Sequence, residues 1–235
     1  MKKVVRFFAL ATMAVCMTAF VACQDKEEDG PNNGNNTNNE PEAVAVPIEE
    51  NFDGTTIPTG WLNIDADGDG YKWYIGMGEN SGQGPYTSGI DGSNCIASAS
   101  WDNSAPNEGV LNPDNYLVSP EFHVHSSGGY TLTWYDAAQD GDYPSDKYSV
   151  YAGTVENNVF TPMGDALFTT VLTTTDFTQR SVSLDAYKGK DIRIAFRHHD
   201  CSDWFVMKID NVKVSKAGAK GPATIACAEG VKKVK

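Results

Sequence analysis

The segment Asp191-Ile192-Arg193-Ile194-Ala195-Phe196-Arg197 alternates apolar and polar side chains with a period of two residues. Ile192, Ile194 and Phe196 would face one side of a β-strand, and the two arginines would face the other. Strand-like segments recur between turns rich in Gly, Asp, Pro and Asn, at residues 73–75, 130–135, 148–151, 181–184, 204–209 and 212–214. Helical periodicity is weak throughout, so the sequence predicts an all-β, antiparallel β-sandwich or jelly roll.

The first residues have the composition of an export signal. Three basic residues precede an apolar run at residues 7–21, which is too short for a membrane-spanning helix. A small residue directly before Cys23 resembles a bacterial lipobox. Residues 1–22 are therefore interpreted as a lipoprotein signal peptide, and Cys23 is the predicted lipidation site.

The next segment is polar and of low complexity. Residues 24–29 form an acidic run that resembles the surface-export signal of Bacteroidota lipoproteins. The Asn-rich continuation is polar through Pro41 and cannot build a core, so residues 23–45 are predicted to be a flexible tether. We expect an outer-membrane lipoprotein that is exposed on the cell surface.

The charge of the chain limits its partners. It carries 31 acidic and 18 basic residues among 235, a formal net charge of −13. This excess argues against nucleic acid and anionic membrane surfaces, so membrane contact is expected through the N-terminal lipid only. The folded domain is expected at residues 46–216, followed by a basic C-terminal tail at residues 217–235. The pairing of Cys95, Cys201 and Cys227 is left open by the sequence.

One loop has the composition of a calcium site. Asp65, Asp67 and Asp69 occupy alternate positions before a glycine, as in the first half of an EF-hand loop. The second half differs, because the twelfth position is Gly76 rather than Glu and no helical pattern flanks the loop. We expect a Ca²⁺ loop inside a β-protein, with Tyr71 also among the ligands and the missing ligands supplied from elsewhere. The alternative is a solvated Asp/Gly turn.

Other residues could suggest catalysis or a transition metal. His199 and Cys201 could share a strand face, but a thiol enzyme also needs an oriented base and an oxyanion hole. His123 and His125 lie on one strand face, and a third metal ligand is not evident. Four aspartates after a strong strand could serve glycoside hydrolysis, turn formation or a second calcium site. They are Asp136, Asp140, Asp142 and Asp146.

Aromatic side chains in loops could contact a ligand, by stacking on sugar rings or by anchoring a protein partner. Tyr86 and Tyr143 lie in Gly-rich or Pro-containing loops, and they are the predicted ligand contacts. Most of the other aromatic side chains are expected in the core. They include Tyr71, Trp73, Tyr74, Trp101 and Trp204.

Several motifs occur in the order found in one family of surface domains. They include Asn51-Phe52-Asp53-Gly54, Ser98-Ala99-Ser100-Trp101, Asn112-Pro113-Asp114-Asn115-Tyr116, Ala195-Phe196-Arg197-His198 and Ile209-Asp210-Asn211-Val212. On these motifs the chain resembles the cleaved-adhesin, or choice-of-anchor J, domains, which include the haemagglutinin/adhesin domains of the gingipain proteases. The resemblance implies a jelly-roll sandwich of the galactose-binding-like or MAM-like kind that binds structural calcium. It also implies adhesion to host proteins or cell surfaces.

The resemblance also implies where further calcium ligands lie. In similar jelly rolls, acidic residues near the first strand approach those of the last strand, and here these are Glu50, Asp53 and Asp210. One Ca²⁺ would then join the two ends of the domain, and the Asp65–Asp69 loop would hold the same ion or a second one.

The sequence therefore predicts a non-catalytic, surface-anchored adhesin domain that is stabilised by Ca²⁺ and binds a host protein or a cell-surface glycan. The alternative is a carbohydrate-binding module of a glycan-uptake system, which would share the fold and the anchor and differ in the ligand. A hydrolase and a structural coat protein without a ligand are the other interpretations.

Overall fold

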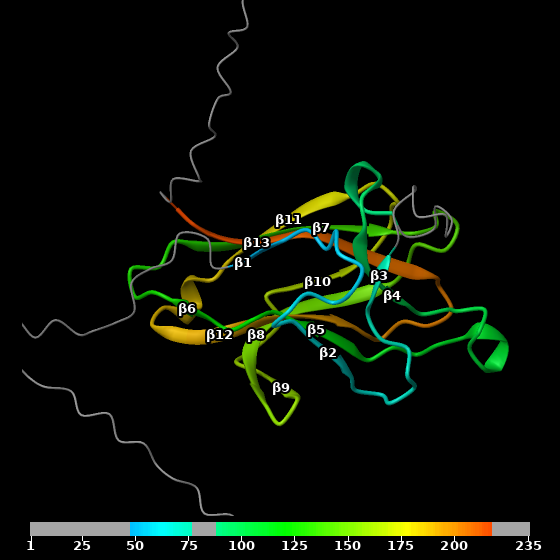
Figure 1. The fold of residues 1–235 in the computed structure, drawn as a ribbon, viewed down its shortest axis with the longest axis horizontal. Helices are drawn as coiled ribbons and strands as arrows, with labels where there is room; N and C mark the ends of the chain where they lie inside the picture. Colours follow the sequence, from blue (N-terminus) through cyan, green and yellow to red (C-terminus); the bar gives the residue numbers. More distant parts are fainter. Residues whose placement is uncertain (1–47, 77–87, 218–235) are drawn as a thin grey trace, which may run out of the picture. The chain divides into compact units, whose positions relative to one another are not determined.

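The computed structural model of the chain describes residues 48–76 and 88–217. Two antiparallel sheets lie one above the other in Figure 1. The first sheet has six strands in the order β11-β7-β13-β4-β3, and β1 pairs with β13. Its strands are β1 (Ile48–Glu50), β3 (Tyr74–Gly76), β4 (Cys95–Ala99), β7 (Tyr130–Ala138), β11 (Thr178–Ser183) and β13 (Val206–Lys216).

The second sheet has seven strands in the order β10-β8-β12-β5-β2, with β6 beside β12 and β9 beside β8. Its strands are β2 (Leu62–Asp65), β5 (Asn115–Val118), β6 (Phe122–Val124), β8 (Lys147–Glu156), β9 (Val159–Pro162), β10 (Phe168–Val171) and β12 (Lys190–His198). Three single 3₁₀ turns complete the described elements: η2 (Ile90–Gly92), η3 (Asn107–Gly109) and η4 (Asp185–Tyr187). The structure therefore confirms the all-β, antiparallel jelly-roll sandwich predicted from the sequence.

The core lies between the sheets, and aromatic contacts join them. Trp134 of β7 packs edge-on against Phe196 of β12 and Phe168 of β10, with ring centroids 5.7 and 5.3 Å apart. Burial of such side chains away from water is the main contribution to the stability of a sandwich of this kind. Ile192, Ile194 and Phe196 are fully buried, which confirms the alternation predicted for β12.

The last strand differs from its prediction in one respect. Residues 204–209 and 212–214 were expected to form separate strands, whereas β13 is a single strand with a bulge between Asp210 and Lys213. Asn211 has a positive φ of 48° within this bulge, so the strand bends there without ending. β1 pairs antiparallel with β13, with Glu50 opposite Val212, which confirms that the first and last strands are neighbours.

Three long connections meet at one end of the sandwich, which we call the loop end: residues 100–114, 139–146 and 199–205. Backbone hydrogen bonds join them to each other and to the strands. Ser100 donates its N–H to the Phe205 carbonyl at 2.9 Å, and Gln139 donates its N–H to the Val206 carbonyl at the same distance. Among the described residues, no helix has the length and apolar character needed to cross a membrane.

Candidate functional site

The predicted calcium loop connects β2 to β3 and gathers three carboxylates. Oxygen atoms of Asp65, Asp67 and Asp69 all lie within 4.8 Å of one another. Gly68 and Gly70 donate their N–H groups to the Asp65 carboxylate at 2.7 and 3.0 Å, which fixes its orientation. Burial, together with the neighbouring Asp65 and Asp69 carboxylates, raises the pKa of Asp67 to about 6. This crowded set offers the hard oxygen donors that Ca²⁺ prefers.

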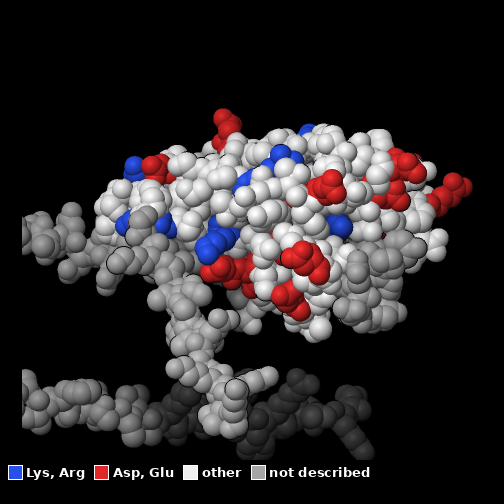
Figure 2. Space-filling view, turned by 90° about the horizontal axis from the view of Figure 1, so that it is seen from above, with Lys and Arg blue, Asp and Glu red and all other residues white. Residues whose placement is uncertain are grey.

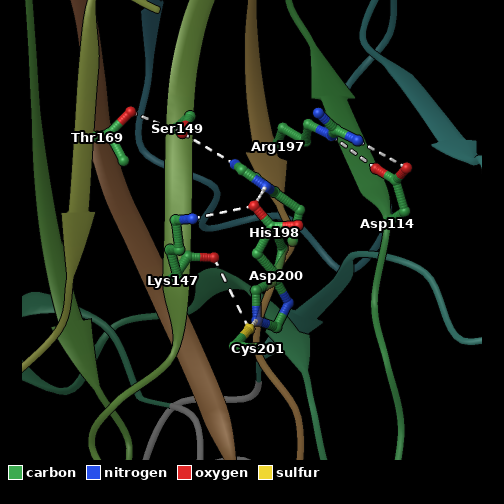
Figure 3. A network of polar contacts seen from close by, with 9 residues as sticks. Asp114, Lys147, Ser149, Thr169, Arg197, His198, Asp200 and Cys201 are labelled. Carbon is green, nitrogen blue, oxygen red and sulfur yellow. Dashed lines mark hydrogen bonds and ion pairs between the residues drawn. The ribbon is translucent and has the colours of Figure 1, made fainter.

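A contact that the sequence analysis missed holds this loop against the second sheet. Asp114 donates its N–H to the Asp67 carboxylate at 3.1 Å and accepts the Ala66 N–H at 2.9 Å. Its own carboxylate receives two hydrogen bonds from Arg197 of β12, at 2.7 and 2.8 Å (Figure 3). Tyr71 supports the loop through its backbone, since its N–H donates to Asp69 at 2.7 Å. The sequence analysis named Asp114 only as part of a family motif. Its role in holding the loop could not be predicted, because its partner Arg197 is 83 residues away in the sequence.

The second predicted set of calcium ligands lies beside the β1–β13 pair. Glu50 accepts the Phe52 N–H at 2.9 Å. Asp210 is buried, and its pKa is raised to about 6 by this burial, with a smaller contribution from the negative charge of Asp53. The structure thus brings Asp53 and Asp210 into electrostatic contact. Glu50 ends β1, which neighbours β13, and its carboxylate accepts a hydrogen bond from the turn that directly follows β1.

A closely packed group of oxygen atoms adjoins Asp210 at Gly89. A Cβ atom added to Gly89 would lie 2.4 Å from the Asn94 carbonyl oxygen, 2.5 Å from Asp210 Oδ2 and 2.9 Å from Ser93 Oγ. These oxygen atoms are packed closely against residue 89, and Asp210 Oδ2 also accepts the Ile90 N–H at 2.9 Å. Only glycine fits at this position without moving Asp210 or its neighbours.

The loop end carries a surface depression, which we call the ligand hollow. Tyr143 and Trp204 are exposed, at 55% and 37%, although both are large and apolar. Trp101 is held in place, because its indole N–H donates to the Glu108 carbonyl at 3.1 Å and its ring packs against Phe205 at 5.8 Å. The lining residues are Trp101, Asp140, Tyr143, Asp203, Trp204 and Phe205.

The ligand hollow combines residues from all three connections of the loop end. Tyr143 was a predicted ligand contact, whereas Trp101 and Trp204 were expected in the core. Trp204 is exposed because Asp203 has a positive φ of 58° and turns the chain just before it, whereas Trp101 is half-buried at the edge of the hollow. The other predicted contact, Tyr86, lies outside the described residues.

A sequence model described as "Cleaved Adhesin Domain" matches residues 45–214, which include both sheets and every site described above. The chain belongs to the Cleaved Adhesin Domain family. This confirms the resemblance inferred from the ordered motifs, and it agrees with the jelly-roll sandwich seen in the structure.

Relatives of this Cleaved Adhesin Domain occur in Porphyromonas gingivalis. Hemagglutinin A is 32% identical over 212 residues, which cover 83% of this chain and 8% of hemagglutinin A. Lys-gingipain W83 is 34% identical over 184 residues, which cover 73% of this chain and 10% of that protein. The chain therefore spans only about a tenth of the length of these relatives.

Solved structures of the family have the same fold. The crystal structure of the K3 Cleaved Adhesin Domain of Lys-gingipain from P. gingivalis W83 has a TM-score of 0.60 and 34% identity to this chain. It covers 73% of this chain and 100% of that domain. The K1 domain of the same protein gives a TM-score of 0.60 at 32% identity, with 73% and 98% coverage. The similarity to Lys-gingipain thus includes its adhesin domains.

The sequence analysis paired the wrong histidine with Cys201. β12 ends at His198, and Asp200 has a positive φ of 51°, so the chain reverses instead of continuing as a strand. This reversal places the Cys201 sulfur 3.2 Å from His198 Nε2 (Figure 3). His199 instead forms a hydrogen bond of 2.9 Å with Ser149. Burial raises the pKa of Cys201 to about 12, so the thiol is protonated at neutral pH and is a poor nucleophile.

The four aspartates considered for hydrolysis do not form one group. Asp136 lies within β7 rather than in the loop; it is buried, and it accepts hydrogen bonds from Arg180 at 2.9 and 3.1 Å and from the Tyr148 hydroxyl. Asp146 is buried beside His198, and only Asp140 lines the ligand hollow. Asp142 donates its N–H to Asp140 at 2.8 Å and so shapes the turn.

The two histidines considered for a transition metal also have separate partners. His123 forms a hydrogen bond with Asp191 at 2.8 Å, and His125 forms one with Ser127 at 2.9 Å. Cys95 is buried, and Cys201 is a half-buried thiol. The signal peptide at residues 1–22, the lipidation site Cys23, the tether at residues 23–45, Cys227 and all but the first residue of the 217–235 tail lie outside the described residues.

Proposed function

We propose that this domain is a non-catalytic adhesin, stabilised by calcium and exposed on the cell surface, that binds a protein ligand through the ligand hollow. The observation that carries the proposal is the hollow, where aromatic side chains and carboxylates are exposed together at the loop end. Family membership supports adhesion as the class of activity. The relatives' names, hemagglutinin and gingipain, do not supply a ligand for this chain, so the ligand is argued from the hollow.

The aromatic side chains are suited to anchoring a partner. Tyr143 and Trp204 expose large apolar surfaces, and residues of these types are enriched at the centres of binding sites. Trp101 is already fixed by its hydrogen bond to Glu108 and by its packing against Phe205. A platform that is fixed before binding loses little side-chain entropy when the ligand arrives.

The charge of the hollow favours a basic ligand. Asp140 and Asp203 line it together with the aromatic rings. A Lys or Arg side chain can pair with a carboxylate and at the same time lie over an aromatic face. Figure 2 shows Lys and Arg spread over the left and middle of one face, whereas the charged side chains visible at the right-hand end are acidic. That is the end at which the η3 loop lies in Figure 1.

Calcium is proposed as a structural ion in two places. Asp65, Asp67 and Asp69 would hold one ion, and Asp210 with Glu50 and Asp53 would hold a second. Bound Ca²⁺ would neutralise crowded carboxylates and fix the surrounding loops. Extracellular modules of this kind bind at about 10⁻⁴–10⁻³ M, which millimolar calcium outside the cell would satisfy.

The anchor is proposed from the sequence. Lipidation at Cys23 would hold the chain at the outer membrane, and the tether at residues 23–45 would separate the folded domain from it. A domain presented in this way reaches ligands outside the cell without a catalytic step.

An array of host extracellular proteins, probed with the full chain in Ca²⁺, tests the proposal. Binding should fall as salt rises, because the ligand is basic. Tyr143→Ala and Trp204→Ala should each weaken binding by about 10-fold or more. The matched control is Val159→Ala, which removes an equally exposed apolar side chain from β9. Unchanged binding by both hollow variants would contradict the proposal.

The second candidate function is carbohydrate binding, because exposed aromatic rings beside carboxylates also stack on sugars and hydrogen-bond to them. A glycan array probed in parallel separates the two. Selective glycan binding that is lost in Tyr143→Ala, with little dependence on salt, would favour the carbohydrate-binding module. Protein binding that is suppressed by salt would favour the adhesin.

A further inference from the structure

A buried group of three different metal-binding side chains lies beneath the loop end. Asp146 and His198 are fully buried, and Cys201 is partly buried. His198 Nε2 lies 3.1 Å from Asp146 Oδ1 and 3.2 Å from Cys201 Sγ, and the sulfur lies 3.7 Å from the same Asp146 oxygen. One nitrogen, one oxygen and one sulfur therefore form a compact triangle.

The fold brings the three residues together from two connections. Asp146 directly precedes β8, and His198 ends β12, which pairs with β8 so that His198 is opposite Tyr148. The reversal at Asp200 then returns Cys201 to the end of β12. The Cys201 sulfur also lies 3.8 Å from the Lys147 carbonyl oxygen, which keeps it at the start of β8 (Figure 3).

Two serines orient the group: Ser98, which lies in β4, and Ser100, which follows that strand. Ser98 Oγ lies 2.8 Å from His198 Nδ1, so an N–H on Nδ1 can donate to it and leave Nε2 as the free lone pair. Ser100 donates its hydroxyl to Asp146 Oδ1 at 2.6 Å. Outer partners of this kind commonly fix metal-ligating histidines and carboxylates.

A separate observation points to a missing partner. Asp146 has no exposed side-chain surface, and its second oxygen, Oδ2, is buried without a hydrogen-bond partner. An unpaired buried carboxylate oxygen carries a large desolvation cost unless an ion or a water satisfies it. The carboxylate accepts the Ser100 hydroxyl on Oδ1, and its Oδ2 lacks a protein partner, so the group can take up an ion.

We propose that Asp146, His198 and Cys201 bind one divalent transition-metal ion of the zinc class. Zinc binds Cys sulfur at about 2.3 Å and His nitrogen or carboxylate oxygen at about 2.0–2.2 Å, so the edges between ligands of a tetrahedral site are roughly 3.3–3.7 Å. The three distances in the triangle are close to these edges. Ca²⁺ and Mg²⁺ are a poor match, since both prefer oxygen to nitrogen and sulfur.

The surroundings leave a fourth coordination position available. A surface hollow adjoins Cys201 and Ser202, so a water or an incoming ion can reach the partly exposed sulfur. On binding, the thiol proton passes to solvent and the thiolate becomes the ligand, so one proton is released for each ion bound. The ion would join β8, β12 and the 199–205 connection that carries Asp203 and Trp204 of the ligand hollow.

Cobalt is the probe, because Co²⁺ occupies zinc sites and absorbs light. The purified full chain, reduced and saturated with Ca²⁺, is titrated with Co²⁺ and then with Zn²⁺. We expect a thiolate-to-cobalt charge-transfer band in the near ultraviolet that saturates at one ion per chain and disappears when zinc displaces the cobalt. Cys201→Ser should remove the band, and Asp146→Asn should weaken Co²⁺ binding by about 10-fold or more.

The matched control is Cys95→Ser, which replaces a buried cysteine outside the group and should leave the band unchanged. Circular dichroism establishes that each variant is folded. If Cys201→Ser fails to fold, Cys201→Ala and zinc-protected alkylation of Cys201, followed by mass spectrometry, replace it. The absence of a band in the unmodified chain, or a band that persists without Cys201, would overturn the proposal.

Discussion

Asp67→Asn should change the stability of the domain in opposite directions with and without calcium. The amide retains an oxygen that can accept the Asp114 N–H, which the Asp67 carboxylate accepts at 3.1 Å, so the substitution removes charge and little else. Without calcium it relieves the repulsion from Asp65 and Asp69 that contributes to the raised pKa of Asp67. The melting temperature in EDTA should therefore stay the same or rise.

In calcium the same substitution removes a charged ligand. At about 10 mM Ca²⁺ and a dissociation constant of about 10⁻⁴–10⁻³ M, one bound ion stabilises the fold by roughly 1.4–2.7 kcal/mol. For a domain of this size that is about 3–10 °C in melting temperature, and most of it should be lost in Asp67→Asn.

The assay is a thermal melt of the full chain and of the variant, each in Ca²⁺, in Mg²⁺ and in EDTA. Asp165→Asn is the control, since Asp165 is an exposed aspartate after β9, away from both proposed sites. A loss of stability in EDTA as large as in Ca²⁺ would refute the reasoning, because the carboxylate would then stabilise the loop by itself. Equal stabilisation of the unmodified chain by Mg²⁺ would also count against a calcium site.

Three further predictions concern the calcium sites and the core. Because the pKa values of Asp67 and Asp210 are both raised to about 6, protons compete with Ca²⁺ below that pH. The calcium-dependent rise in melting temperature should be full above about pH 7 and disappear towards about pH 5; a rise that is independent of pH would contradict this. Gly89→Ala places a Cβ 2.5 Å from Asp210 Oδ2 at an ordinary φ of −79°, so calorimetry should show one Ca²⁺ fewer per chain. Arg180→Met leaves the buried Asp136 carboxylate without its cation and should cost about 3–5 kcal/mol in urea unfolding, with a smaller loss for Arg180→Lys; a cost under about 1 kcal/mol would be inconsistent with the buried pair.

The parts of the fold that depend on local pattern could be predicted from the sequence. The alternation in residues 191–197 predicted β12 and the buried faces of Ile192, Ile194 and Phe196. The three alternate aspartates of the 65–69 loop are brought together as expected, because a short loop with glycines can curl on itself.

The parts that depend on chain reversals and long-range contacts could not be predicted. Strand alternation pairs His199 with Cys201, but the positive φ at Asp200 makes His198 the contact instead. Likewise, Trp101 and Trp204 are far apart in sequence, and tryptophan is a residue type that we expected to find in the core. They meet at the surface because β4 and β13 pair, which brings the connections at their ends together.

The most direct test of the central claim is hydrogen–deuterium exchange of the full chain with and without the tightest protein ligand from the array. The account predicts that protection on binding is confined to the loop end, at residues 100–114, 139–146 and 199–205, with no change in β9 or β2. Protection centred on β9 or β2, with the loop end unchanged, would contradict the proposal that the ligand hollow is the adhesive surface.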